Sequence, residues 1–201
     1  MRRIFFDTEF TGLHKGTTLV SIGLISDEGE RFYAELTDFD DTQCDEWIEK
    51  NVLDHLILSG NEELAKTLGE DGMTTVVLGS KNDVRAELLE WLDNFKDDIQ
   101  FVSDVCHYDM VLLCDLLADG AVLLPDYINP FCHDITQDIA MVLDISEAEA
   151  FDFSREELLT NRGISLPKGQ KHNALYDAEV IKAIYDDLLT VGGVNKEGKN
   201  G

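Results

Sequence analysis

The chain has 201 residues, of which 44% are hydrophobic and 28% are charged, a composition typical of one soluble globular domain. Its 16 Lys and Arg residues stand against 41 Asp and Glu residues, and the formal net charge of −25 argues against a protein that holds nucleic acid mainly by neutralising phosphates. No apolar run of about 18 residues and no secretory signal pattern is present, so we expect a cytoplasmic protein without a membrane segment. The four cysteines lack CxxC spacing, which favours reduced thiols over disulfides or a zinc site.

Three strand patterns begin the chain, at residues 4–10, 19–25 and 31–37, and their short connections predict an antiparallel meander. A helix should follow from a cap at Thr42 through Leu56, because its apolar residues have helical spacing. Residues 58–82 contain several glycines, and we interpret them as an insertion that holds a short strand at Thr74–Leu78.

Helices and strands alternate in the rest of the chain, which predicts an α/β domain with a five-stranded mixed sheet flanked by helices. The expected helices are 83–95 with Asn82 as its cap, 110–117, 135–143, 154–163 and a last one after His172, and the expected strands are 99–102 and 127–132. We expect one domain over residues 1–191 and a flexible tail over residues 192–201.

The first strand carries two acids, Asp7 and Glu9, at alternate positions. Alternate side chains of a strand share one face, so the two carboxylates should lie about 7 Å apart and repel each other. A divalent cation such as Mg²⁺ would relieve this repulsion, because hard cations prefer carboxylate oxygens. The alternative is an exposed edge strand whose acids face solvent.

A further acid stands where an apolar strand gives way to an apolar helix, the end at which α/β folds bind ligands. Asp109 fits this position and suits the first turn of a helix, and Asp104, five residues earlier, competes for the same role. An ordinary acid at a helix N-terminus is the alternative.

Asp177 lies next to the apolar stripe of the last helix, where a buried acid needs a partner or a metal ion. His172 precedes it by five residues and follows a polar loop, so its imidazole could take a proton from water beside a carboxylate site. A surface histidine at a helix start is the alternative.

Two acid-free stretches, residues 10–26 and 158–176, contrast with the acidic remainder of the chain. The second carries Lys168 and Lys171 close to His172. We expect these stretches to form a neutral-to-basic mouth, although burial alone could explain much of the first.

Three motifs, in order over residues 4–180, resemble those of the DEDDh (RNase T-like, DnaQ-like) 3′–5′ exonuclease superfamily. Residues 7–13, DTEFTGL, resemble the common DxETTGL motif, His107-Tyr-Asp109 resembles the end of the second motif, and His172–Asp177 has the HxxxxD spacing of the third. The chain looks most similar to small bacterial and phage exoribonucleases of the mycobacterial polyadenylate-specific ribonuclease type. One departure is Val105, where many relatives have Asn.

The resemblance implies an RNase H-like fold and removal of nucleotides from the 3′ end of single-stranded nucleic acid, RNA rather than DNA. It implies that Asp7, Glu9, Asp109 and Asp177 hold two Mg²⁺ ions, with Mn²⁺ as a substitute, and that His172 is the general base. A homodimer is one assembly that the resemblance allows, with residues 58–82 as a candidate contact.

Substrate contacts are expected next to the acids and in the second acid-free stretch. The candidates are Phe10, Thr11, Gly12, Leu13, Tyr108, Lys168 and Lys171, with the aromatic rings stacking on bases and the lysines contacting phosphates. Two other functions remain open at this point: a 3′–5′ exodeoxyribonuclease with the same site, and a non-catalytic acidic interaction module on the same fold.

Overall fold

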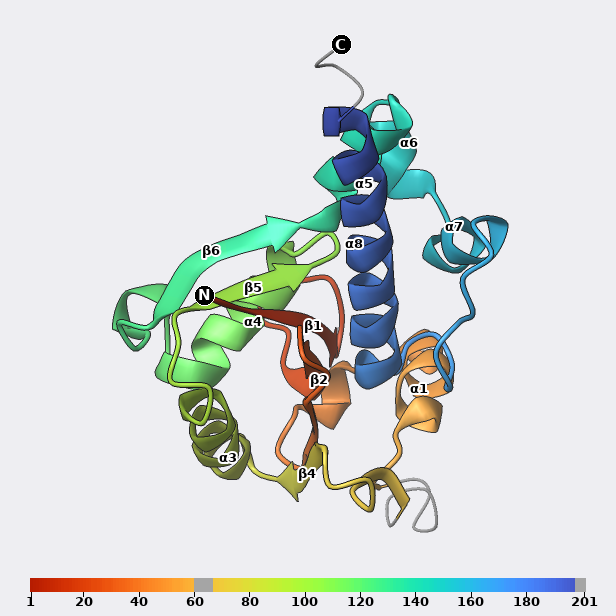
Figure 1. Ribbon diagram of the computed structural model, residues 1–201. Coiled ribbons are helices and arrows are strands. Elements are labelled where there is room, and N and C mark those ends of the chain that lie inside the picture. Colours follow the sequence, from red (N-terminus) through yellow and green to blue (C-terminus); the bar gives the residue numbers. More distant parts are fainter. Residues whose placement is uncertain (60–66, 198–201) are drawn as a thin grey trace.

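Six strands form one mixed sheet at the centre of the molecule, in the order β4-β3-β2-β1-β5-β6. Figure 1 shows the computed structural model, which describes residues 1–59 and 67–197, the last nine of them as helical backbone only. The strands are β1 (Arg2–Phe10), β2 (Leu19–Ser26), β3 (Arg31–Leu36), β4 (Thr74–Gly79), β5 (Ile99–Ser103) and β6 (Ile128–Asp134). β2 pairs antiparallel with both β1 and β3. The other three pairs are parallel: β4 with β3, β5 with β1, and β6 with β5.

The expected mixed sheet with an antiparallel meander is confirmed, but the expected number of five strands is wrong. The sixth strand is β4, which pairs in parallel with β3 at the edge of the sheet. We expected a strand here only as part of an insertion, because glycines surround it in the sequence. Its pairing with β3 is a contact between distant residues, and local sequence does not encode it.

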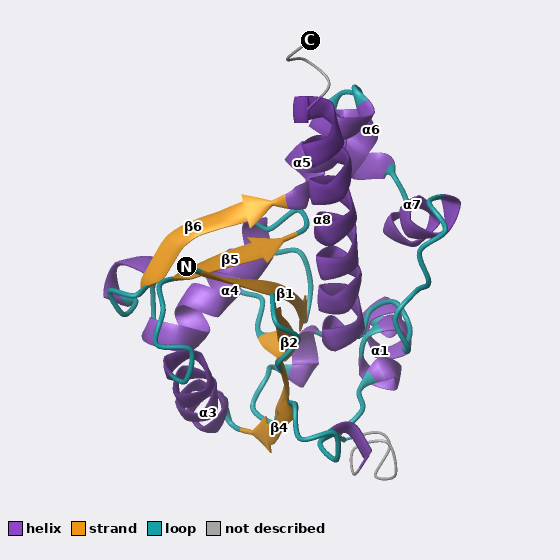
Figure 2. Cartoon of the chain, in the orientation of Figure 1, coloured by secondary structure: helices purple, strands orange, loops and turns teal. Residues whose placement is uncertain are grey.

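Helices cover both faces of the sheet, as Figure 2 shows. One face packs against α3 (Lys81–Asp93) and α4 (His107–Ala118), and the other against α8 (Ala174–Glu197). α5 (Ile135–Leu143) and α7 (Arg155–Asn161) pack against α8, and α6 (Glu147–Asp152) packs against α5. The short helix α1 (Glu46–Asn51) and the 3-10 turns η1 (Asp41–Gln43), η2 (Leu53–His55) and η3 (Ala121–Leu123) lie in the connections. No described helix has the length and apolar character needed to cross a membrane.

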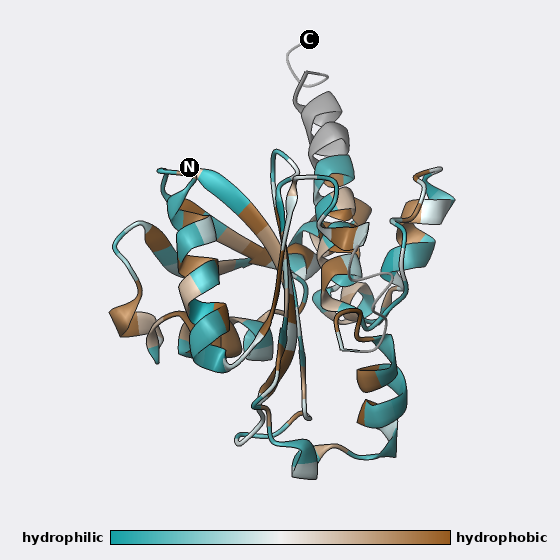
Figure 3. Ribbon diagram, turned by 90° about the horizontal axis from the view of Figure 1, so that it is seen from below, coloured by the Kyte–Doolittle hydropathy of each residue, from teal (hydrophilic) through white to brown (hydrophobic). Residues whose placement is uncertain are grey.

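β1 contributes to both cores because its side chains alternate between the two faces. Ile4 and Phe6 belong to the core beneath α3 and α4, whereas Phe5 belongs to the core beneath α8. Figure 3 shows the strands between the two groups of helices, with hydrophobic segments on both sides of the sheet. The sheet is therefore a buried partition, and β1 lies near its middle.

The expected continuous helix from Thr42 to Leu56 is wrong. Asp45 caps α1 through the backbone N–H of Ile48, and the chain leaves the helix after residue 51 before the turn η2 begins. The apolar residues Ile48, Val52 and Leu56 still pack in one cluster, around Val20 of β2, although the helix that was expected to carry them is interrupted.

Two helix starts differ from the expectation for the same physical reason. Ser80, rather than Asn82, caps α3, because Ser80 and Asp83 form a reciprocal capping box. A second capping box, between Ser146 and Glu149, begins α6, which was not predicted although its Ser-x-x-Glu pattern is present in the sequence.

The last helix is longer than expected, since α8 continues as helical backbone through residues 192–197 of the expected tail. Residues 198–201, and residues 60–66 of the expected insertion, lie outside the described residues. The single-domain interpretation of residues 1–191 stays a prediction.

Gly23 on β2 provides the space for the start of α8. A Cβ atom at this position would lie 2.3 Å from the backbone nitrogen of Leu175 and 2.4 Å from the carbonyl carbon and oxygen of Ala174. Backbone atoms cannot give way as a side chain can, so any residue larger than glycine must displace α8 from the sheet.

We therefore expect Gly23→Ala to lower the free energy of unfolding by about 1–3 kcal/mol, measured by urea denaturation. Gly16→Ala is the matched control, because the nearest atom to its added Cβ would be 3.9 Å away. Equal stability of the two variants would contradict the close packing of β2 and α8.

Candidate active site

Asp7 and Glu9 lie on the face of the sheet that α8 covers, the same face as Phe5. Glu9 is buried and Asp7 is partly buried. Since β1 lies between β2 and β5, the alternative of an exposed edge strand is wrong. The two acids instead sit on a strand with hydrogen-bonded neighbours on both sides.

Asp109 reaches the site from the first turn of α4, directly after the carboxyl end of β5. Its Oδ1 accepts hydrogen bonds from the backbone N–H of Thr8 at 3.0 Å and from the Thr8 hydroxyl at 2.6 Å. Thr8 stands between Asp7 and Glu9, so this contact fixes a helix from one face of the sheet to the acidic strand. Sequence reasoning missed Thr8, although a hydroxyl residue between two acids was a readable signal.

Asp104, the competitor for the role of Asp109, is already paired. Nε and Nη2 of Arg155 donate to its two carboxylate oxygens at 2.6 and 2.8 Å, and the hydroxyl of Thr136 donates to it at 2.8 Å. This geometry favours Asp109 as the fourth site acid.

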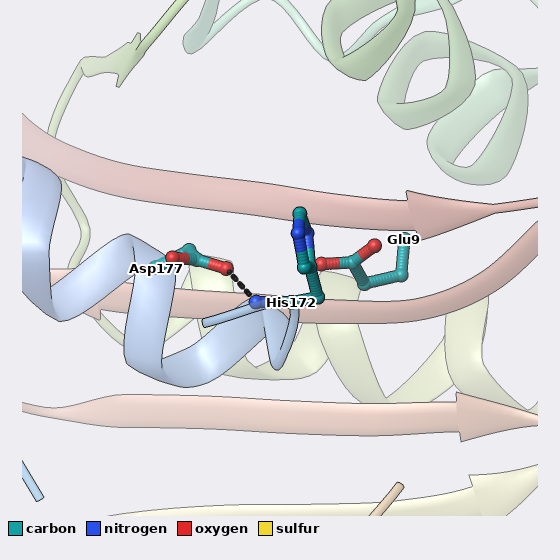
Figure 4. A group of neighbouring side chains, drawn as sticks. All are labelled: Glu9, His172 and Asp177. Carbon is teal, nitrogen blue, oxygen red and sulfur yellow. Dashed lines mark hydrogen bonds between the residues drawn. The ribbon is translucent and has the colours of Figure 1, made fainter. Parts of the chain in front are cut away.

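His172 and Asp177 are joined at the start of α8. The backbone N–H of His172 donates to Oδ2 of Asp177 at 2.8 Å, and His172 has a left-handed φ of 64°. Among the described residues, donor atoms of Glu9, His172 and Asp177 all lie within 4.8 Å of one another. Figure 4 shows the His172 ring beside the Glu9 carboxylate. The imidazole is therefore within reach of any water or cation that the carboxylates hold.

Neighbouring side chains fix the segment that carries His172. The Trp47 ring packs edge-on against the imidazole with centroids 5.2 Å apart, and Nδ1 of His55 is hydrogen-bonded to the carbonyl of Lys171 at 2.9 Å. On the other side, Nδ2 of Asn173 donates to the carbonyl of His55 at 3.1 Å. The residues before and after His172 are thus both tied to the turn η2.

A buried carboxylate beneath this turn completes the support. Glu35 on β3 accepts five hydrogen bonds of 2.6–2.8 Å, from the hydroxyls of Tyr33 and Ser59 and from the backbone N–H groups of residues 57, 58 and 59. Tyr33 in turn accepts a hydrogen bond from Asn173 at 3.2 Å. Glu35 resembles an ordinary polar strand residue in the sequence, because all of its partners except Tyr33 lie more than 20 residues away.

The pKa values of the four site acids are raised. Burial is the main cause for Asp7 and Glu9, and the neighbouring charges of Asp109 and Asp177 push the same way, so both pKa values lie well above the usual range. Burial also raises the pKa of Asp109 to about 6 and that of Asp177 to about 7. Burial, together with the charges of Lys171 and His55, lowers the pKa of His172, which leaves its imidazole neutral at pH 7.

These residues line one cavity of about 710 Å³, a size typical of ligand sites. Phe10, Gly12, Leu13 and Lys171 are part of its wall. Thr11 also lines it but is buried, and its hydroxyl is hydrogen-bonded to Oε1 of Gln43 at 2.6 Å, so this side chain supports the wall from inside.

Two expected substrate residues lie outside the wall. The Tyr108 ring stacks on Phe10, with centroids 5.5 Å apart and planes at 22°, so Tyr108 supports Phe10 from behind. Lys168 does not line the cavity either. Substrate contact by Phe10, Gly12, Leu13 and Lys171 stays a prediction.

The sequence pattern of the 3′–5′ exoribonuclease Rv2179c-like domain matches residues 2–189, nearly the whole chain. The chain belongs to this family. The expected resemblance to exoribonucleases of the mycobacterial type is thereby confirmed, as is the enzyme class, a 3′–5′ exoribonuclease.

Two kinds of relative agree with the Rv2179c-like family. The 3′–5′ exoribonuclease Rv2179c of Mycobacterium tuberculosis strain H37Rv is 28% identical over 136 residues, which cover 67% of this chain and 72% of that protein. Among solved structures, a 3′-exonuclease that recognises the histone mRNA stem-loop aligns with a TM-score of 0.62 at 10% identity, over 94% of this chain and 63% of that one. The chain thus spans less than two thirds of that exonuclease.

A second solved structure is Pop2p of S. pombe in a form with bound Mg²⁺ and Mn²⁺. It aligns with a TM-score of 0.55 at 16% identity, over 94% of this chain and 82% of that one. At these identities the likeness concerns the fold, and it confirms the expected RNase H-like α/β architecture of the Rv2179c-like domain.

The raised pKa values of the site acids predict a pH-dependent stability. In the metal-free protein Asp177 binds its proton more tightly when folded, with a pKa of about 7, than when unfolded, with a pKa of about 3.9. The folded state therefore holds more protons between these values, and its stability falls as pH rises through that range.

We expect Asp177→Asn to become progressively more stable relative to the natural protein as pH rises from 4 to 8, measured by denaturation in EDTA. Asp186→Asn, a change on the more exposed side of the same helix, should give no such trend. Stabilities that change with pH in the same way for the natural protein and for Asp177→Asn would contradict the raised pKa of Asp177.

Proposed function

We propose that this exoribonuclease removes nucleotides one at a time from the 3′ end of single-stranded RNA, at a site formed by Asp7, Glu9, Asp109 and Asp177. The observation that carries the proposal is the convergence of four carboxylates, from β1, α4 and α8, on one cavity. Hydrolysis of a phosphodiester needs positive charge where the phosphate binds, and four acids with raised pKa values are a binding site for cations rather than for phosphate itself.

The residues present fit Mg²⁺ or Mn²⁺. The four acids offer only oxygen donors, which hard divalent cations prefer, and cation binding would replace the protons that the raised pKa values retain. Two ions are proposed because the four carboxylates offer more oxygens than one ion needs. When bound, the ions supply Lewis-acid stabilisation of the charge on the phosphate and lower the pKa of water.

His172 is proposed as the general base. Its lowered pKa keeps the imidazole neutral at pH 7, so it can take the proton of the water that attacks phosphorus. The bond from phosphorus to the 3′ oxygen of the preceding nucleotide then breaks, and the departing oxygen is protonated from solvent. The Trp47 ring packs against the imidazole, and the hydrogen bond from the backbone N–H of His172 to Asp177 fixes the backbone that carries it, which favours proton transfer from a defined water position.

The sequence left two other functions open, a non-catalytic acidic interaction module and a 3′–5′ exodeoxyribonuclease. Membership in an exoribonuclease family speaks against the acidic interaction module, because the four acids and His172 are all retained in one cavity. A DNA substrate is tested directly below. A homodimer and a cytoplasmic location remain expectations from the sequence.

Incubation with 5′-labelled single-stranded RNA and DNA of equal sequence tests the proposal. In Mg²⁺ or Mn²⁺, the RNA should shorten from its 3′ end as a ladder, and EDTA or Asp7→Ala should abolish the ladder. Asp126→Ala, an exposed acid outside the cavity, is the control. Degradation that persists in EDTA would overturn the role of the cations, and faster shortening of DNA would overturn the choice of RNA.

Replacing the proposed base separates its role from that of the carboxylates. His172→Ala should lower kcat about 10²–10⁴-fold while Mg²⁺ still raises the Tm of the variant, because the four acids remain. His133→Ala, a histidine paired with Asp138 outside the cavity, should leave kcat unchanged. An unaltered kcat for His172→Ala would remove the general base from the mechanism.

A further inference from the structure

The corner between α6 and α7, residues 150–155, is fixed by one side chain. Arg155 uses all five of its N–H donors: Nε and Nη2 bind Asp104, Nη2 also binds Thr136 at 3.2 Å, and Nη1 donates to the carbonyls of Ala150 and Phe153 at 2.7 Å each. Although Arg155 lines the cavity, it has no donor left for a phosphate. Its role is to hold the α6–α7 corner in one shape.

This corner presents two exposed aromatic rings to the catalytic cavity. Phe151 and Phe153 both line the cavity that contains Asp7 and Asp109, yet 58% and 43% of their surfaces remain exposed. Elsewhere on the molecule, Phe131 on β6 is 75% exposed and does not line the cavity. Large apolar rings that stay exposed inside a site, on a rigid support, indicate contact with a ligand.

The charge of the chain favours contacts to the bases of RNA over contacts to its phosphates. With a net charge of −25 and with Arg155 fully engaged, positive side chains can supply little of the affinity for RNA. Stacking of bases on aromatic rings is insensitive to this charge and to base identity. The α6–α7 corner continues the wall of the cavity that holds the site acids, so a single strand bound there can extend onto it.

We propose that Phe151 and Phe153 form a base-stacking subsite for one nucleotide of single-stranded RNA, separate from the contacts expected at Phe10 and Leu13. The subsite rests on the proposed function, since its ligand is the same strand whose 3′ end lies at Asp7. It gives the enzyme affinity for a polynucleotide beyond the contact expected at Lys171.

A mutational cycle between protein and RNA tests this subsite. The rate of 3′-nucleotide removal, as kcat/KM, is measured for the natural protein, Phe151→Ala and Phe153→Ala on RNA of one sequence and on versions with a single abasic nucleotide at each of the last few positions. Each variant should lose about 5- to 100-fold on intact RNA. The loss should vanish when the abasic nucleotide is at one particular position and persist at the others. A nucleotide without a base makes no stacking contact, so removing the phenylalanine ring then has no further effect.

Phe131→Ala is the matched control and should behave as the natural protein does on every RNA. No loss for either variant, or a loss that persists with every abasic RNA, would overturn the subsite. Failure of the proposed function is distinguishable, because the natural protein would then leave intact RNA undegraded.

Discussion

Mutual repulsion among four buried or partly buried carboxylates is the constraint on which the rest of the site depends. Asp7, Glu9, Asp109 and Asp177 come from three elements, and burial raises the pKa of each. Hydrogen bonds from Thr8 and from the backbone of the segment before α8 hold two of them in place. Bound divalent cations would supply the balancing charge, which explains how a chain of net charge −25 can act on a polyanion.

The sheet brings these acids together by its position between two layers of helices. β1 presents acids to the α8 side, while Thr8 holds the start of α4 from the other side. Gly23 on β2 allows the first turn of α8 to approach the sheet closely. The distance between Asp177 and the acids of β1 is thus set by backbone contact, which is stiffer than contact between side chains.

Two other acids near the cavity have a different role. Glu35 receives five hydrogen bonds, and Asp104 is paired with Arg155, so neither needs a cation. Glu35 supports the segment that carries His172, and Asp104 fixes the corner that presents Phe153. Each supporting acid accepts hydrogen bonds at both carboxylate oxygens, whereas the hydrogen bonds described for Asp109 and for Asp177 engage one oxygen each.

The sequence by itself determined the meander, most helices and the family, because strand alternation, helical spacing and three short motifs are local patterns. It also placed Asp7 and Glu9 on one face of a strand, since that follows from backbone geometry alone. Only the tertiary structure paired Asp104 with Arg155, added β4 to the sheet, and placed Glu35 beneath the segment that carries His172. Each of these depends on partners far away in the chain, such as Arg155, 51 residues from Asp104, and local patterns carry no information about such contacts.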